Sequence, residues 1–140
     1  LSTIDTKNYK IISRDEIVIS KYAKMSNSKD FSYSTAFKNV TQEEVNKELY
    51  ELIKTTINNE ENFIVDMTNC SAKARRKILS NLKKNYIKIA KTFVESSKTI
   101  LSRNSFINGK NIPESAIYDM FNRFMLPTYD EFDKIEFINI

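Results

Sequence analysis

Residues 41–66 read TQEEVNKELYELIKTTINNEENFIVD, and they predict a long amphipathic helix followed at once by a short strand. Thr41 and Glu44 stand in the positions of a capping box, with Thr41 as the N-cap and Glu44 reaching back to it. The apolar residues that mark one face of the helix are Val45, Leu49, Leu52, Ile53 and Ile57. The run Phe63-Ile64-Val65 is continuously apolar, which is typical of a strand buried on both faces.

The flanking sequence continues this alternation in both directions. Further strands are expected at residues 9–13, 86–93 and 134–138. Further helices are expected at residues 14–24, 71–82, 96–104 and 113–125, and a loop rich in Ser, Asn and Lys at residues 25–39. Strands separated by helices need crossover connections, so the sheet should be mostly parallel. The sequence therefore predicts an α/β layer sandwich, with residues 1–140 in a single domain.

Two of these helices carry a recognisable apolar face. In the helix capped by Ser71, the buried side is expected to consist of Ala74, Ile78, Leu79 and Leu82. In the helix that begins at Pro113 and is stopped by Pro127, the apolar stripe consists of Ile117, Met120, Phe121, Phe124 and Met125.

The composition excludes several kinds of site. The 140 residues contain one glycine, Gly109, one cysteine, Cys70, and no histidine. A glycine-rich phosphate-binding loop needs at least two glycines, so this chain contains none. The usual zinc sites and histidine-based catalysis are excluded as well, and no metal-ligating residues are expected. Chemistry in this chain must therefore use carboxylates, Lys, Arg, hydroxyl groups or Tyr.

Charge and hydropathy bear on location and partners. The net charge of +4 favours polyanionic partners weakly, and a lysine-rich solvated surface is the simpler explanation. No apolar run approaches the roughly 20 residues of a membrane span. A lone cysteine fits a reducing compartment. We therefore expect a cytoplasmic protein that does not bind a membrane.

Three polar segments are expected near the carboxyl ends of the strands, where open parallel sheets collect their functional residues. They are residues 13–16, residues 66–69 and residues 103–113. Each segment also has a simpler explanation. Residues 13–16 could be an N-cap with acidic residues, and residues 66–69 an ordinary strand-to-helix turn. Arg103 and Lys110 could be solvated charges at a helix end. The occurrence of the three segments together in this order is what favours a functional site.

Together these residues resemble a known family. The runs Phe63 to Asn69, Ala74-Arg75-Arg76, Arg103-Asn104 and Gly109 to Glu114 look like the polynucleotide 5′-kinase-like P-loop kinases. The ending, Met120 to Pro127 followed by Phe132 to Ile135, is similar to the broader group of kinase-like domains. The resemblance covers residues 9–138 and implies a parallel-sheet, three-layer P-loop kinase-like sandwich.

The resemblance also implies a role for each matching residue. Asp15 would be the general base that takes the proton of a 5′-hydroxyl, and Arg103 would be a lid arginine that clamps phosphate oxygens. Gly109 and Lys110 would form the turn of the lid. Thr68 and Lys110 would contact the nucleotide, and Arg14, Asp66 and Asn69 would order the active site. The implied cofactors are ATP and Mg²⁺, and the implied acceptor is a nucleic acid or a nucleoside.

The chain also departs from the family pattern. The family's first strand, its phosphate loop and most of its first helix would precede Leu1, which is not a native Met start, so we expect the domain to be N-terminally incomplete. The second lid arginine falls near Phe106 and Ile107, and the acceptor-phosphate arginine falls near Val18, which are all apolar. Two hypotheses stay open: part of an active kinase, as in phage repair enzymes, or an inactive kinase-like module that binds nucleic acid or protein in a larger assembly.

Overall fold

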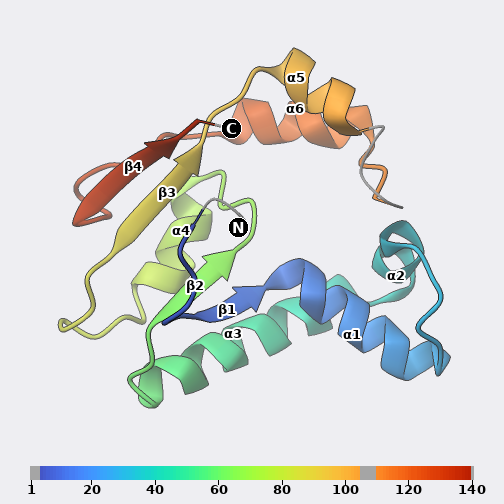
Figure 1. Cartoon of the computed structure of the whole chain (residues 1–140), viewed down its shortest axis with the longest axis horizontal. Coiled ribbons are helices and arrows are strands. Elements are labelled where there is room, and N and C mark those ends of the chain that lie inside the picture. The colour runs from blue at the N-terminus through green and yellow to red at the C-terminus, as the bar shows by residue number, and fades with distance from the viewer. Residues whose placement is uncertain (1–3, 105–109, 140) are drawn as a thin grey trace. The chain divides into compact units, whose positions relative to one another are not determined.

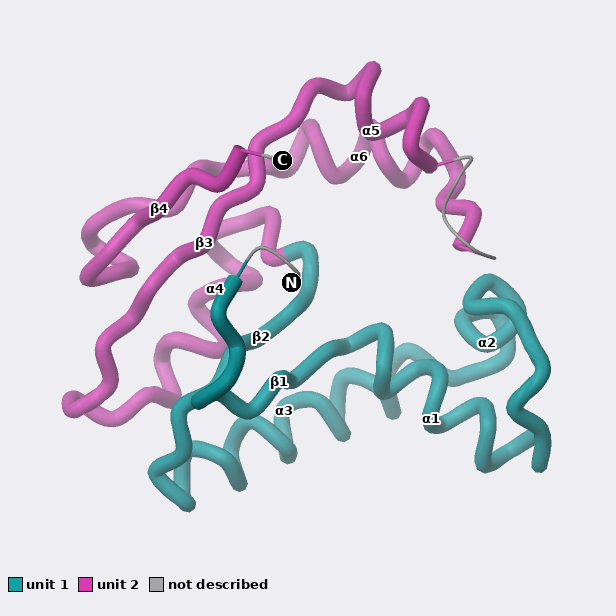
Figure 2. Tube along the Cα trace, viewed as in Figure 1, with its two compact units in different colours: residues 1–68 teal, residues 69–140 magenta. Residues whose placement is uncertain are grey.

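The computed structural model describes residues 4–104 and 110–139, and these residues form six helices and four strands (Figure 1). The chain divides into two compact units, residues 1–68 (unit 1) and residues 69–140 (unit 2) (Figure 2). The protein is thus a mixed α/β structure with parallel strands, as the sequence predicted. In the described residues these strands form two separate two-stranded sheets, where a single sheet was expected.

Unit 1 contains two parallel strands and three helices. Their bounds are Lys10–Ser13 for β1, Arg14–Ser26 for α1, Tyr33–Asn39 for α2, Gln42–Asn58 for α3 and Phe63–Asp66 for β2. β1 and β2 pair in parallel, and α1 and α3 pack against each other and against β1 (Figure 1). The core of unit 1 is made by Ile12, Ile17, Val18, Ala36, Val40, Val45, Leu49, Ile53 and Ile57.

The helix α2 corrects the sequence prediction, which placed a loop at residues 25–39. Its apolar residues Tyr33, Ala36 and Phe37 stand at i, i+3 and i+4, a short helical spacing within a segment that is otherwise rich in Ser, Asn and Lys. Two local contacts also favour the helix. The Ser32 hydroxyl accepts a hydrogen bond from the Thr35 amide at 3.2 Å, and Ala36 is completely buried. A helix of this length is stabilised mainly by tertiary packing, which a single sequence does not reveal.

The helix and strand of residues 41–66 form as predicted, with two corrections of detail. Thr41 is the N-cap of α3, but its side chain makes no capping hydrogen bond, so the expected capping box is absent. The three apolar residues of β2 are only half-buried, so the prediction of a strand buried on both faces was wrong. β2 has one strand neighbour in the described chain, and fewer neighbours bury less of its surface.

Unit 2 contains the remaining strands and helices. Their bounds are Ala72–Leu79 for α4, Ile89–Phe93 for β3, Ser97–Asn104 for α5, Glu114–Arg123 for α6 and Lys134–Ile138 for β4. β3 and β4 pair in parallel over their whole length, from Ile89 opposite Lys134 to Phe93 opposite Ile138. Lys91 and Glu136 form an ion pair across this sheet.

The helices of unit 2 are shorter than predicted and bury less. Ser71 caps α4 as expected, because its Oγ accepts a hydrogen bond from the Ala74 amide at 3.2 Å. α4 nevertheless ends at Leu79, and β3 begins at Ile89 where the sequence predicted residue 86. Of the expected apolar stripe in α6, Ile117 alone is fully buried. Phe121, Phe124 and Met125 are exposed.

Within the described residues, no helix has the length and apolar character needed to cross a membrane.

Candidate functional site

The parallel pairing of β1 and β2 brings two of the predicted segments to one edge of unit 1. Ser13, the last residue of β1, lies opposite Asp66, the last residue of β2. Ser13 also caps α1, because its Oγ accepts a hydrogen bond from the Glu16 amide at 3.5 Å. Arg14 and Asp15 therefore begin a helix directly at this edge. Of the three polar segments expected at the carboxyl ends of the strands, residues 13–16 and 66–69 thus meet at one edge, while residues 103–113 belong to unit 2 and lie partly outside the described residues.

Asp15 is held by a residue of α2. The Tyr33 hydroxyl donates a hydrogen bond of 2.7 Å to Asp15 Oδ1. Burial raises the pKa of Tyr33 above its usual range, and the hydrogen bond and charge of Asp15 raise it further. The phenol therefore keeps its proton at neutral pH and stays a donor. This contact fixes one carboxylate oxygen of Asp15 in a partly buried position.

Arg14 makes its polar contacts with α3. Its guanidinium donates a hydrogen bond of 2.6 Å to Gln42 Oε1 and one of 3.2 Å to Asn46 Oδ1. Both acceptors lie in the first two turns of α3. These contacts join the start of α1 to the start of α3, and so they fix the helix turn that carries Asp15. Arg14 thus holds the start of α1 against the start of α3.

Asp66 and Thr68 lie at the same end of β2, and both are exposed. Their side chains are therefore accessible to solvent. The described residues contain no group of three or more His, Cys, Asp or Glu side chains that could hold a metal ion.

Asn69 marks the start of unit 2 and has an unusual backbone. Its φ of 43° lies in the left-handed region, which Asn tolerates better than most residues. Its side-chain Oδ1 is buried and has no hydrogen-bond partner among the described residues. Its carbonyl oxygen accepts a hydrogen bond of 3.1 Å from Arg75. Asn69 is therefore one of the residues that hydrogen-bond to Arg75.

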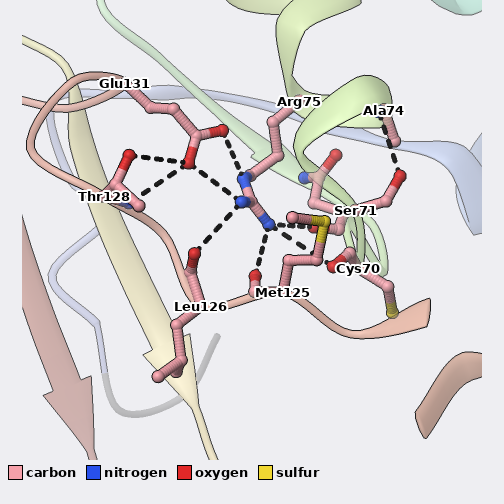
Figure 3. Close-up of polar contacts among 9 residues, drawn as sticks. Cys70, Ser71, Ala74, Arg75, Met125, Leu126, Thr128 and Glu131 are labelled. Atoms are coloured by element: carbon pink, nitrogen blue, oxygen red, sulfur yellow. Dashed lines mark hydrogen bonds and ion pairs between the residues drawn. The ribbon is translucent and has the colours of Figure 1, made fainter. Parts of the chain in front are cut away.

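Arg75 makes an extensive set of polar contacts within the described residues of unit 2 (Figure 3), and the sequence marked it only as part of the run Ala74-Arg75-Arg76, without a role. It is 7% exposed, and two of its nitrogens each donate a hydrogen bond of 2.9 Å to the carboxylate of Glu131. It also donates to the carbonyl oxygens of Cys70, Met125 and Leu126, the shortest of these bonds being 2.8 Å to Met125. Arg75 thereby joins α4 to the segment that follows α6.

Glu131 completes this cluster. The hydrogen bond from Arg75 lowers the pKa of Glu131, against the opposing effect of burial, and Thr128 lowers it further through its amide and hydroxyl. The Thr128 amide donates to Glu131 Oε2 at 3.1 Å (Figure 3). Each carboxylate oxygen therefore has a donor. The cluster is saturated with internal partners, which indicates a structural role.

The residues implied for the lid lie around the end of α5. Arg103 is about half exposed and pairs with Glu95, its guanidinium lying 3.7 Å from the carboxylate. Lys110 is half-buried, and Gly109 lies outside the described residues. The buried Asn104 donates to the Ile112 carbonyl oxygen at 2.7 Å and accepts from the Ile112 amide at 3.0 Å. Asn104 thus fixes residue 112 to the end of α5, a role that the sequence did not suggest.

The candidate residues fall into two groups. Arg14, Asp15, Asp66 and Thr68 belong to unit 1, where the ends of β1 and β2 bring them to one edge. Asn69, Arg103 and Lys110 belong to unit 2. Comparisons with protein-family models, with curated proteins and with solved structures find no match to this chain.

Two of these residues had a signal in the sequence. Arg75 lies three residues before Ile78 and therefore on the same face of α4, a spacing that was present in the sequence but was not used to predict its burial. Tyr33 has helical spacing to Ala36 and Phe37, but its segment was predicted as a loop.

Proposed function

We propose that this chain is the larger part of an ATP-dependent phosphotransferase domain that resembles polynucleotide 5′-kinases, with Asp15 as its general base. The observation that carries the proposal is the position of Asp15. It begins a helix at the carboxyl edge of two parallel strands, and the Tyr33 hydroxyl fixes its Oδ1 at 2.7 Å. Open α/β sheets bind their ligands at that edge.

The chemistry required of Asp15 is a proton transfer. As the oxygen of an acceptor hydroxyl attacks the γ-phosphorus of ATP, its proton passes to the Asp15 carboxylate. The bond between the γ-phosphorus and the β,γ-bridging oxygen breaks, and ADP leaves. The hydrogen bond from Tyr33 to Oδ1 would hold the carboxylate in place for this step. Phosphoryl transfer depends largely on orientation of the nucleophile, and a carboxylate at the start of a helix is well suited to provide it.

The residues of this chain do not form a complete binding site for ATP and Mg²⁺. The single glycine excludes a phosphate-binding loop, and the described residues contain no metal-ligating cluster. The proposal therefore assigns the phosphate loop to a segment encoded before Leu1. From this chain, Thr68, Arg103 and Lys110 would contribute contacts to the nucleotide. Arg103 would have to exchange its ion pair with Glu95 for phosphate oxygens.

The pairing of the strands supports the proposal that a further strand, encoded before Leu1, completes the sheet. Each unit by itself holds one parallel pair of consecutive strands, β1 with β2 in unit 1 and β3 with β4 in unit 2. In the described residues each of these strands has one strand neighbour, so its other edge could accept the backbone hydrogen bonds of a further strand. In doubly wound sheets the first strand lies inside the sheet, with later strands on both sides of it.

The upstream reading frame tests this proposal directly. We expect it to encode a strand followed by a GxxxxGK[ST] segment about 20 residues before Leu1, because a P-loop joins a strand to a helix. We also expect the full-length protein to bind Mg-ATP in a calorimetric titration. A frame without that segment, together with no binding of Mg-ATP, would favour an inactive kinase-like binding module, which the existing pairing of Arg103 with Glu95 also fits.

Asp15 itself is tested by substitution in the full-length protein. Asp15→Asn should lower phosphoryl transfer by about 10²- to 10⁴-fold, which is the usual contribution of a general base. Asp30→Asn is the matched control, because Asp30 is an exposed carboxylate of unit 1 outside the β1–β2 edge. Transfer from labelled ATP to a 5′-hydroxyl oligonucleotide measures the effect. Equal turnover in both variants would remove Asp15 from this role.

A further inference from the structure

The charges of this chain are unevenly distributed. Residues 67–94 hold eight of the 22 basic residues and none of the 18 acidic residues. The rest of the chain is therefore net acidic, although the whole chain has a net charge of +4. A lysine-rich surface that serves solubility alone would intersperse both signs of charge. This segregation indicates a surface with a specific anionic partner.

Five of these cations are exposed, on α4 and in the turn that follows it within unit 2. Lys73, Arg76 and Lys77 are exposed and are spaced at i, i+3 and i+4, so they share one face of α4. Arg75 and Ile78 are buried. Lys83 and Lys84 follow in the turn after α4 and are exposed as well. We call these five exposed residues, 73, 76, 77, 83 and 84, the basic face.

Four of the five cations of the basic face differ in their ion pairing from lysines elsewhere in the described residues. Elsewhere, lysines pair with carboxylates, as Lys10 does with Glu61 at 3.4 Å and Lys21 with Glu48 at 3.2 Å. Within the described parts of the chain, Lys73, Arg76, Lys77 and Lys84 form no ion pair. Like charges at i and i+4, such as Lys73 and Lys77, repel each other and destabilise a helix. A bound polyanion would relieve this repulsion.

The chemistry of the surrounding surface favours nucleic acid over a membrane. A helix that binds at a membrane surface carries large apolar side chains beside its cations. Among the described residues, no large apolar side chain is exposed between residues 67 and 86. The exposed neighbours Ser80 and Asn81 are instead polar and can donate hydrogen bonds to phosphate oxygens.

We propose that the basic face binds the phosphate backbone of nucleic acid without sequence preference. The contacts would be made by cations to phosphates, and the binding would release the counterions condensed on the nucleic acid. This inference stands on unit 2 alone. It does not depend on Asp15, on ATP or on turnover, so it holds whether or not the chain belongs to an active kinase.

The test measures how the binding of a labelled single-stranded oligonucleotide depends on salt. Binding five phosphates to a single strand gives a slope of log K against log salt of about −3.5, so affinity should fall about 100-fold from 50 to 200 mM NaCl. For the variant K73Q/R76Q/K77Q the magnitude of this slope should be smaller by about 2. Its affinity should therefore fall only about sevenfold over the same range of salt. Gln is a good helix former, so α4 should persist, which circular dichroism checks.

The matched control is K29Q/K47Q/K54Q, which removes the same charge from exposed positions in unit 1. This control should keep the slope of the unmodified protein. An equal reduction of the slope in both triple variants would show a general effect of charge and would overturn the proposal. An unchanged slope in K73Q/R76Q/K77Q would overturn it as well. So would binding to vesicles rich in phosphatidylserine without binding to the oligonucleotide.

Discussion

At the scale of single residues, the contact between Asp15 and Tyr33 joins the candidate site to the helix that the sequence did not predict. A phenol hydroxyl that donates to a carboxylate restricts that carboxylate to one orientation. General bases need such orientation, since their efficiency depends on alignment with the proton that they take. The same contact is measurable without any substrate, because it raises the pKa of Tyr33.

Asp15→Asn should lower the pKa of Tyr33 toward its usual value. The substitution removes the negative charge that disfavours the phenolate, while the effect of burial remains, so we expect a partial return. Titration of the ¹³Cζ resonances of the tyrosines by NMR measures this pKa. Asp30→Asn should leave it unchanged. If the two variants titrate alike, Tyr33 does not contact Asp15 in solution, whatever the outcome of the kinase assay.

The location of Asp15 and Asp66 could be predicted from the sequence, while the partner of Asp15 could not. Both carboxylates follow recognisable strands, and parallel pairing alone places such residues at one edge. Tyr33 reaches Asp15 because α2 packs against α1. This is a tertiary contact, and the sequence does not specify which helices pack together. Arg75 is the opposite case, since its helical spacing to Ile78 was available from the sequence.

At the scale of elements, α4 depends on a salt bridge as much as on apolar packing. Its fully buried side chains are Arg75 and Ile78, and the guanidinium of Arg75 bonds to Glu131 and to four backbone carbonyl oxygens. Removing one partner of a buried ion pair leaves a charge without compensation, which typically costs 3–5 kcal/mol, or roughly half the stability of a small domain.

Glu131→Gln should therefore lower the free energy of unfolding by about 3 kcal/mol, the lower end of that range, because the amide oxygen can still accept from Arg75. Urea denaturation followed by circular dichroism measures the loss. Asp130→Asn is the control, since Asp130 is an exposed neighbouring carboxylate. Similar midpoints for both variants would show that the cluster does not stabilise unit 2.

The same variant should change the response to acid. The pKa of Glu131 is lowered by folding, so its contribution to stability is complete above its ordinary value of 4.5 and is lost as the pH falls through the folded value. Glu131→Gln lacks this group, so its stability should fall less steeply below pH 4.5 than that of the unmodified protein.

At the scale of the whole molecule, the alternation of strands and helices was predictable, but the distribution of buried surface was not. Nine apolar residues of unit 1 are fully buried, against two of unit 2, Ile78 and Ile117, in the described part of the chain. The stripe of α6 was read correctly as apolar, yet most of it is exposed. Sequence periodicity identifies the apolar face of a helix, while burial depends on the surface that meets it.

Hydrogen exchange should show this difference in buried apolar surface between the two units. Burying a large apolar side chain contributes about 1.5–3 kcal/mol, and about 1.4 kcal/mol changes an opening equilibrium tenfold. We therefore expect amides of α3 to exchange at least about tenfold more slowly than those of α6 and β3, as measured by mass spectrometry of peptides. In the longer protein that includes the proposed upstream strand, protection should rise in β3 and change little in α3. Equal protection of α3 and α6 in this chain would show instead that the two units unfold together.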